Sequence, residues 1–398
     1  MPWKETDVRD ERIRFVVQAE QGTEMAALCR AFGISRKTGY KWLRRYRQAG
    51  SLLGLEEVSR RPRHSPGRTA SAVEQQVVQL RREMGGWGSR KLQVLLADDQ
   101  IQLARSTIDQ ILRRLGVLQA GARSNRPAVQ RFERAMPNEL AQMDFKGEYR
   151  MSGGGRCYPL SVIDDHSRFS LGLYALGSQR AGEVQGKLIE WFRQYGLPSA
   201  VLIDHGTPWW SPTNGHGLTK LSVWLIKQDI RLHLSGIRHP QTQGKVERFH
   251  RTLDEAVSHW GRPQTLAGFA ELFARFRALY NHRRPHESLG MRPPDSRYQP
   301  SSRPYCSQPA QWQYSADVFV LRLNSAGCLY HRGRLHFVSE ALAAEWVGCR
   351  EFDDKLLVQY RQMYVREIDL RTGNTRALAS PVANGSDSRF QVGGKINL

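Results

Sequence analysis

Three acidic side chains stand where carboxylates could act together. Asp144 lies in Gln-Met-Asp-Phe-Lys-Gly, Asp204 ends the apolar run Val-Leu-Ile-Asp, and Glu247 lies in Gly-Lys-Val-Glu-Arg-Phe-His. Mg²⁺ prefers oxygen ligands, and two ions about 3.5 to 4 Å apart can stabilise both the attacking and the leaving oxygen of an in-line phosphoryl transfer. The set therefore predicts metal-assisted phosphoryl transfer, although a single strand-end Asp is more often a turn residue.

Basic side chains accompany these carboxylates. Lys245, Arg248 and Arg251 flank Glu247 and could neutralise the phosphates of a bound strand. The whole chain has a net charge of +21 and a pI near 10.2. Residues 1–137 alone hold 26 Lys and Arg against 14 Asp and Glu. This balance predicts a polyanionic partner, and the alternative is a generally basic protein that binds no polyanion.

The elements around the carboxylates are predicted to bring them to one rim of a sheet. Strands at 140–145 and 200–203 end near Asp144 and Asp204, and a helix at 244–259 has a buried stripe beside Glu247. Strands at 158–164 and 169–175 form a hairpin around Asp164 and Asp165, which we interpret as turn residues rather than metal ligands. The remaining elements are helices at 181–195, 218–228 and 266–280 and a strand at 231–234. Their order predicts a mixed sheet covered by helices.

The first 50 residues predict three short helices, at 10–20, 24–32 and 35–49. Gly33 can turn the chain, and Ser35 can cap the third helix, which gives a helix-turn-helix. Arg36, Lys37 and Lys41 would then face outward near the start of the third helix, where such proteins enter the major groove. A generic three-helix bundle is the alternative, and Gly39 weakens the third helix by about 1 kcal/mol relative to Ala.

A second helical block is predicted at 73–83, 89–97 and 106–115, with Ser106 and Asp109 as a capping pair. It resembles another helix-turn-helix. Six of its basic residues are predicted to contact phosphates, with a solvated surface as the alternative for each. They are Arg81, Arg82, Arg90, Lys91, Arg113 and Arg114.

After residue 300 the pattern changes to short β-like runs, at 318–323, 335–338, 356–360 and 363–368, with a helix around 340–346. A small β-barrel is the expected fold. The full division is a helix-turn-helix domain at 1–50, a basic linker at 51–71, a second helix-turn-helix domain at 72–118, a basic linker at 119–137, an α/β core at 138–300, the small β-barrel domain at 301–380 and a flexible tail at 381–398.

Several other classes of protein are excluded by the composition. No stretch approaches the roughly 18 apolar residues of a membrane span, and the five cysteines form no CxxC pair. We therefore expect a reduced, cytoplasmic protein with no membrane association and no structural zinc. His239, His250, His282 and His286 lack a zinc-ligand arrangement, which leaves DNA-facing or packing roles. The run of three glycines at 153–155 lacks the Lys-Ser/Thr of a phosphate loop.

Five motifs together resemble the DDE transposases of bacterial insertion sequences, the branch related to retroviral integrases. They lie at 28–42, 142–147, 162–168, 239–253 and 280–290, and the resemblance covers nearly the whole chain. It implies an RNase H-like integrase core with Asp144, Asp204 and Glu247 as the catalytic, metal-binding triad. It also implies two Mg²⁺ ions, for which Mn²⁺ could substitute, and a homo-oligomer, at least a dimer, on double-stranded DNA from the element ends and the target. A helper protein is not identified.

Two features depart from the family pattern. His205 stands where related sequences commonly have Asn, and the 42 residues between Asp204 and Glu247 exceed the spacing in the family's name. The extra length falls in 209–217, where a loop can absorb it. Trp209 and Trp210 in this segment could stack on unpaired bases near the cut, with packing in the core as the alternative.

Overall fold

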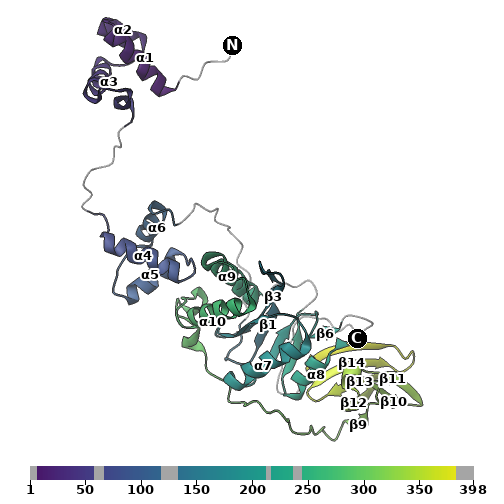
Figure 1. Ribbon diagram of the computed structural model, residues 1–398. Coiled ribbons are helices and arrows are strands. Elements are labelled where there is room, and N and C mark those ends of the chain that lie inside the picture. Colours follow the sequence, from purple (N-terminus) through teal and green to yellow (C-terminus); the bar gives the residue numbers. More distant parts are fainter. Residues whose placement is uncertain (1–6, 58–66, 118–132, 212–216, 236–243, 382–398) are drawn as a thin grey trace. The chain divides into compact units, whose positions relative to one another are not determined.

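The computed structural model describes residues 7–57, 67–117, 133–211, 217–235 and 244–381 (Figure 1). The chain divides into two compact units, Met1–Thr69 and Ala70–Leu398. Parts of the two expected linkers, the residues before Gly244 in the motif at 239–253, and the expected tail after residue 381 lie outside the described residues.

The first unit contains the expected helices, α1 (Val8–Glu20), α2 (Met25–Ala31) and α3 (Arg36–Ala49), followed by a 3₁₀ turn at Leu52–Leu55. Gly33 has a φ of +63°, and the Ser35 side chain accepts a hydrogen bond from the backbone N of Thr38 at 3.1 Å. The turn and the cap that the sequence predicts are therefore confirmed. The apolar core of this unit is built around Phe15, Leu28, Trp42 and Leu55.

Gly39 of α3 faces side chains of both α1 and α2. A Cβ added there would lie 2.7 Å from the Cys29 Sγ and 2.8 Å from the Phe15 Cζ. Glycine is thus needed for packing, and the close approach of the helices outweighs its poor helix propensity.

The second unit begins with α4 (Ser71–Glu83), α5 (Ser89–Asp98) and α6 (Arg105–Arg114), whose apolar faces form one cluster. These helices match the predicted block. The predicted cap does not: α6 starts at Arg105 after Ala104, and no side chain caps it. Asp109 instead lies 3.9 Å from Arg105, one turn earlier on the same helix.

A six-stranded mixed sheet forms the centre of the second unit. Its strands are β1 (Ala141–Phe145), β2 (Tyr149–Arg150), β3 (Arg156–Asp164), β4 (Ser170–Leu176), β5 (Ala200–Ile203) and β8 (Arg231–Leu234). The order is β2-β3-β1-β5-β8, with β4 also paired to β3. The pairs β1–β3 and β3–β4 are antiparallel, whereas β1–β5 and β5–β8 are parallel, as expected for a mixed sheet.

Helices cover both faces of this sheet (Figure 1). One face packs against α7 (Ala181–Tyr195) and α8 (Lys220–Lys227) through a large core that includes Val162 and Leu188. The other face packs against α9 (Gly244–Trp260) and α10 (Leu266–His282) through Ile163, Phe249 and Phe273. Because side chains alternate along a strand, β3 and β4 contribute to both clusters.

The C-terminal region differs from the expected barrel. Its strands are β9 (Phe319–Arg322), β10 (Cys328–His331), β11 (Arg334–Phe337), β12 (Trp346–Phe352), β13 (Lys355–Tyr360), β14 (Met363–Asp369) and β15 (Thr375–Pro381). Five of them form a sheet in the order β15-β14-β13-β12-β9, and β10 and β11 form a separate hairpin. Within the described residues this sheet is open, so the barrel is not confirmed. The expected helix at 340–346 is a 3₁₀ turn, Glu340–Leu342, that leads into β12.

The open sheet packs directly against the central core. Its apolar residues Val347 and Val358 belong to the same buried cluster as Leu221 and Trp209 of the central region. A short antiparallel pair, β6 (Trp210–Ser211) and β7 (Gly217–Leu218), lies at this junction, where Gly217 approaches Ala377 of β15. One shared core therefore joins the two regions, and β15 contacts β8 and β7.

We predict that Gly39→Ala destabilises the first unit by about 1 to 3 kcal/mol, because the new methyl group would overlap Cys29 and Phe15. Hydrogen exchange of the α1–α3 peptides in the full-length protein should become faster. The matched control is Gly186→Ala in α7, where an added Cβ meets nothing within 4 Å. That change should stabilise α7 by about 0.5 to 1 kcal/mol, and a similar response at both positions would contradict the packing argument.

Candidate active site

Parallel pairing of β1 with β5 brings Asp144 and Asp204 to the same level of the sheet. The register pairs Ala141 with Val201 and Gln142 with Leu202. Continued by two residues, this register sets Asp144 opposite Asp204, immediately after the end of β5. Neighbouring strands lie about 4.8 Å apart, so the two carboxylates meet at the carboxyl ends of adjacent strands.

The third carboxylate lies on the helix that covers this part of the sheet. Asp144 pairs with Ser161 across β1 and β3, two residues along β3 from Ile163, and therefore faces the side covered by α9. Val246 is fully buried in that same cluster, and Glu247 follows it in the first turn of α9 with an exposed side chain. The three elements thus bring the three predicted residues toward one rim.

The pKa of Asp144 is affected by the other two carboxylates. The pKa of the Asp144 carboxyl is raised to about 7, chiefly by burial and then by the negative charges of Asp204 and Glu247, while the backbone N–H of Phe145 opposes the shift. Like charges that cannot both be solvated favour the neutral form. The rim is therefore a place of uncompensated negative charge in a strongly basic chain.

Asp204 ends β5 in a tight turn. The backbone N–H of Gly206 donates to its Oδ1 at 3.1 Å, and a Cβ on Gly206 would lie 2.9 Å from Oδ2. A glycine is accommodated here where a side chain would press on the carboxylate. The unusual His205 contacts Trp210 edge to face, with ring centroids 6.1 Å apart.

Carboxylate oxygens are suitable donors for Mg²⁺, and a bound cation would relieve the repulsion that raises the Asp144 pKa. In the described parts of the chain, however, no group of three or more His, Cys, Asp or Glu side chains is arranged to hold a metal ion. The donor set therefore fits a divalent cation in its chemistry, and its side chains would have to come closer together around one.

His250 is a neighbour of Asp144 that the sequence did not single out for this site. Its Nδ1 lies 3.8 Å from the Asp144 Oδ2, and its Nε2 is 2.9 Å from the Ser161 Oγ. Burial, with a smaller effect of the Lys146 charge, lowers the pKa of His250 to about 4, so the imidazole is neutral at pH 7. The spacing Glu247-x-x-His250 on one helix face is the signal that could have indicated it.

Asp164 is the last residue of β3 and Asp165 the first residue of the turn that leads to β4, close to the predicted turn positions. Asp164 accepts hydrogen bonds from the backbone N–H of Ser167 at 2.7 Å and of Asn138 at 2.8 Å. Asp165 forms an ion pair with Lys245 at 2.5 Å. Burial lowers the pKa of Lys245 to about 8. The ammonium expected to meet a phosphate is therefore already paired with a buried carboxylate.

The tryptophans suggested for base stacking are core residues. Trp209 is 1% exposed and Trp210 is 8% exposed, and both belong to the cluster shared with the C-terminal sheet. Neither ring presents a free face, so the stacking role is corrected to packing. The reason is that the segment after Asp204 folds back against α8 and β7, with the Thr219 hydroxyl donating to the Pro208 carbonyl at 2.8 Å.

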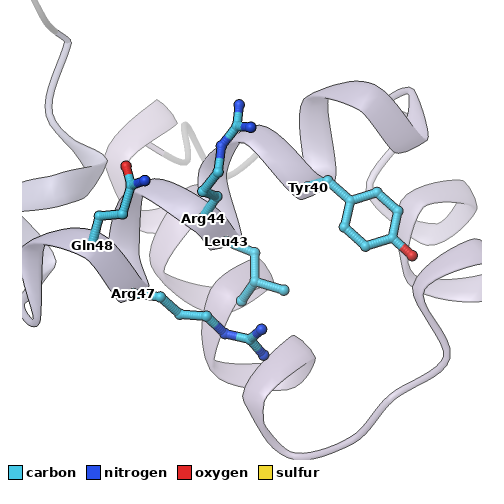
Figure 2. Close-up of a pocket in the computed structure, with 5 residues that line it drawn as sticks. All are labelled: Tyr40, Leu43, Arg44, Arg47 and Gln48. Carbon is cyan, nitrogen blue, oxygen red and sulfur yellow. The ribbon is translucent and has the colours of Figure 1, made fainter.

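The outward face of α3 carries the basic residues predicted to read DNA. Arg36, Lys37 and Lys41 are all exposed. The same face also presents Tyr40, which is 57% exposed, and Arg44 (Figure 2). Together with Leu43, Arg47 and Gln48 these two residues line a shallow pocket of about 320 Å³. Helical spacing from Arg36 could have indicated Tyr40 and Arg44, since each lies four residues after the last.

The other residues predicted to contact DNA differ in their surroundings. Those that are exposed are Arg82, Arg90, Arg113, Arg114, Arg248 and Arg251. Arg90 lies 3.5 Å from Glu287, and Arg114 pairs with the buried Glu74. Lys91 is partly buried, and burial together with the Arg284 charge lowers its pKa to about 8.

Three family models match the chain: a helix-turn-helix domain at residues 11–63, a homeodomain-like domain at 38–112 and an integrase core domain at 228–294. An uncharacterized 31.7 kDa protein of insertion element IS407 from Burkholderia multivorans is 25% identical over 273 residues, 67% of this chain and 95% of that protein. An uncharacterized 39.2 kDa protein of insertion element IS476 from Xanthomonas euvesicatoria is 26% identical over 255 residues, 62% of this chain and 70% of that protein.

Among solved structures, a chain of the simian T-cell lymphotropic virus intasome in complex with the PP2A regulatory subunit B56 gamma has a TM-score of 0.38 and 12% identity, covering 71% of this chain and 91% of that one. The HTLV-2 integrase catalytic core domain in complex with magnesium has a TM-score of 0.33 and 12% identity. The match covers 42% of this chain and 99% of that one.

The family models and the curated relatives confirm the expected resemblance to insertion-element proteins. Helix-turn-helix models match the N-terminal part of the chain and an integrase core model matches residues 228–294, so the chain is similar to insertion-element proteins and has an integrase-like core. No helix in the described ranges is long and apolar enough to cross a membrane.

We predict that Asp144→Asn stabilises the protein in the absence of divalent cations. The folded Asp144 has a pKa of about 7 against an ordinary value of 3.8, so the folded state binds this proton more tightly and loses stability as the pH rises from about 4 to about 7. The variant avoids that loss and should be more stable by roughly 2 to 4 kcal/mol at pH 8, since a pKa difference of one corresponds to about 1.4 kcal/mol.

Thermal unfolding of both proteins at pH 4, 6 and 8 in a chelating buffer measures this difference. It should grow with pH and be small at pH 4. Asp98→Asn, at an exposed position at the end of α5, is the control and should show no such growth. A variant that is less stable than the parent at pH 8 would refute the crowding of charge at the rim.

Proposed function

We propose that this protein is a DDE transposase that binds the terminal inverted repeats of its own mobile element, cleaves the 3′ ends and joins them to target DNA. The observation that carries the proposal is the parallel register of β1 and β5, which sets Asp144 opposite Asp204 at the rim covered by α9, the helix that carries Glu247. The integrase core match, the helix-turn-helix matches and the insertion-element relatives support the same class of enzyme.

Asp144, Asp204 and Glu247 would hold the divalent cations. When bound, two Mg²⁺ ions would stabilise the attacking and leaving oxygens of an in-line displacement, and Mn²⁺ could replace them. The protein itself would supply the orientation: β1 and β5 fix two carboxylates side by side, and α9 brings the third. Arg248 and Arg251 are exposed on α9 and would neutralise phosphates of the bound strand.

His250 would line this site with an uncharged imidazole ring. Its Nε2 is held by the Ser161 hydroxyl, so the ring stays beside Asp144. Because it carries no charge at pH 7, it does not compete with a cation for the carboxylate. The negative charge of the rim would therefore not be neutralised by His250.

Two other functions stand as alternatives. A DNA-binding repressor with an inactive core would share the helix-turn-helix domains, but it would have no need for three coupled carboxylates. A structure-selective nuclease would share the carboxylates, but it would have no need for the two helical blocks with exposed basic faces. We also propose that the working form is at least a dimer on DNA, because an element has two ends.

Asp144→Asn, Asp204→Asn and Glu247→Gln should each reduce both 3′-end cleavage and strand joining at least a hundredfold. A neutral amide is a poorer ligand for Mg²⁺, and one set of ligands would serve both reactions. Labelled element ends incubated with each variant and Mg²⁺ measure the two steps. DNA binding should persist in all three variants.

Glu255→Gln, two turns after Glu247 on the exposed side of α9, is the matched control and should keep its activity. Substantial cleavage by Glu247→Gln would remove this residue from the triad. Cleavage that continues in a chelating buffer would refute the metal-dependent mechanism altogether.

Binding of the element ends should weaken steeply with salt. Neutralising six or more phosphates implies a slope of log affinity against log salt near −5 or steeper. Tyr40→Ala should reduce discrimination between the true and scrambled ends, whereas Lys37→Ala should make the slope less steep by about one. Lys187→Ala in α7 is the control. Fluorescence anisotropy at several salt concentrations measures these changes, and equal affinity for scrambled ends would contradict sequence-specific recognition.

A further inference from the structure

The turn after β3 contains a charge that the proposed chemistry does not use. Asp165 has no exposed surface, although burial of a carboxylate is costly unless the charge is paired and hydrogen-bonded. Its Oδ1 lies 2.5 Å from the Lys245 Nζ and accepts a hydrogen bond from the Gln142 Nε2 at 2.8 Å. Its Oδ2 accepts from the backbone N–H of Arg134 at 2.9 Å. The carboxylate is thus satisfied from several directions.

The partners of Asp165 are placed close to the proposed metal ligands. Gln142 precedes Asp144 by two residues in β1, and Lys245 precedes Glu247 by two residues in α9. The Lys245 Nζ also donates to the Asp165 carbonyl at 3.1 Å, so the ammonium contacts both the side chain and the backbone of the turn. Asp165 therefore connects the strand and the helix that carry two of the three carboxylates.

The start of α9 depends on such an anchor. The first four N–H groups of a helix have no partner within the helix, which makes this end the easiest to fray. Glu247 is exposed, and within the described part of the chain no hydrogen bond or ion pair holds its side chain. Its position therefore follows that of the helix backbone, which is fixed by the buried Val246 and by the Lys245–Asp165 pair.

We propose that Asp165 and Lys245 are positioning residues, whose buried ion pair holds the first turn of α9 against the sheet and so keeps Glu247 beside Asp144. This inference rests on the proposed function. Asp165 belongs to the motif at 162–168 and Lys245 to the motif at 239–253. In this proposal both residues affect the reaction only through the position of Glu247, without contacting DNA or metal. The exposed neighbours Arg248 and Arg251 remain the phosphate contacts on α9.

The test compares Lys245→Met, Lys245→Arg and the double variant Asp165→Asn/Lys245→Met in the full-length protein. Lys245→Met leaves a buried carboxylate unpaired, which could prevent folding, whereas the double variant leaves no unpaired charge. The control is Lys187→Met, which breaks the Lys187–Glu190 pair on the surface of α7. Each variant is assayed for end cleavage over a range of Mg²⁺ concentrations, for affinity to element ends and for thermal stability.

The double variant is expected to fold and to bind DNA within twofold of the parent protein. The Mg²⁺ concentration for half-maximal cleavage should rise at least tenfold, because Glu247 would no longer be held in place. Lys245→Arg should restore most of the parent's Mg²⁺ requirement, and Lys187→Met should not change it. If Lys245 contacted a phosphate instead, DNA affinity and its salt slope would fall with an unchanged Mg²⁺ requirement, and the inference would be overturned.

Hydrogen exchange provides a reading that does not depend on activity. In the protein without metal, the amides of residues 248–251, which close the first turn of α9, should exchange at least tenfold faster in the double variant, while α10 is unchanged. Unaltered exchange at these amides would overturn the positioning role even if the parent protein is active. If the parent shows no cleavage but the exchange rises as expected, the proposed function fails and the anchor stands.

Discussion

The parallel pairing of β1 with β5 forces two like charges together, and much of the central region can be understood from this constraint. Asp144 and Asp204 occupy matched positions at the partly buried rim of the sheet, where the strand register holds them next to each other. Such crowding opposes folding unless a carboxylate takes up a proton or a cation arrives. A protein without a use for the charge would gain stability from replacing either residue.

The surroundings of the rim preserve this charge. The nearest imidazole, His250, is kept neutral by burial, and the ammonium of Lys245 is paired with Asp165 in the turn. Two groups that could have neutralised the rim are thus uncharged or committed elsewhere. The basic excess of the chain is instead found on exposed faces, such as the outer side of α3, where it can meet a polyanion at longer range.

The central core is not a self-contained domain, because the C-terminal sheet packs against it. Its strands share one apolar cluster with α7, α8 and the parallel strands, and Lys227 of α8 pairs with Glu345 at 2.6 Å. The 42-residue segment between Asp204 and Glu247 contributes Trp209 and Trp210 to this shared cluster. The extra length relative to the family pattern therefore serves, at least in part, to pack the two regions together.

Local patterns in the sequence determined most of the elements. The strand 200–203 and the helix 181–195 were predicted to the residue, because apolar periodicity and flanking Gly and Pro act within a few residues. The rim could also be predicted, since a carboxylate at the end of an apolar strand is a local feature. The open sheet could not, because strand closure depends on which edges meet, and β12 and β15 were not among the predicted strands.

Only the tertiary structure decided which charges and rings are free. Lys245 and Arg248 look alike in the sequence, yet one is paired with a buried carboxylate and the other is exposed. Trp209 and Trp210 read as a loop pair, yet both are enclosed by segments far along the chain. Gly39 reads as a helix defect until Phe15 and Cys29 are seen against it. In each case the contacting residues lie many positions away in the sequence. No pattern within a single helix or strand therefore shows whether a side chain is paired or buried, because burial is a property of the assembled fold.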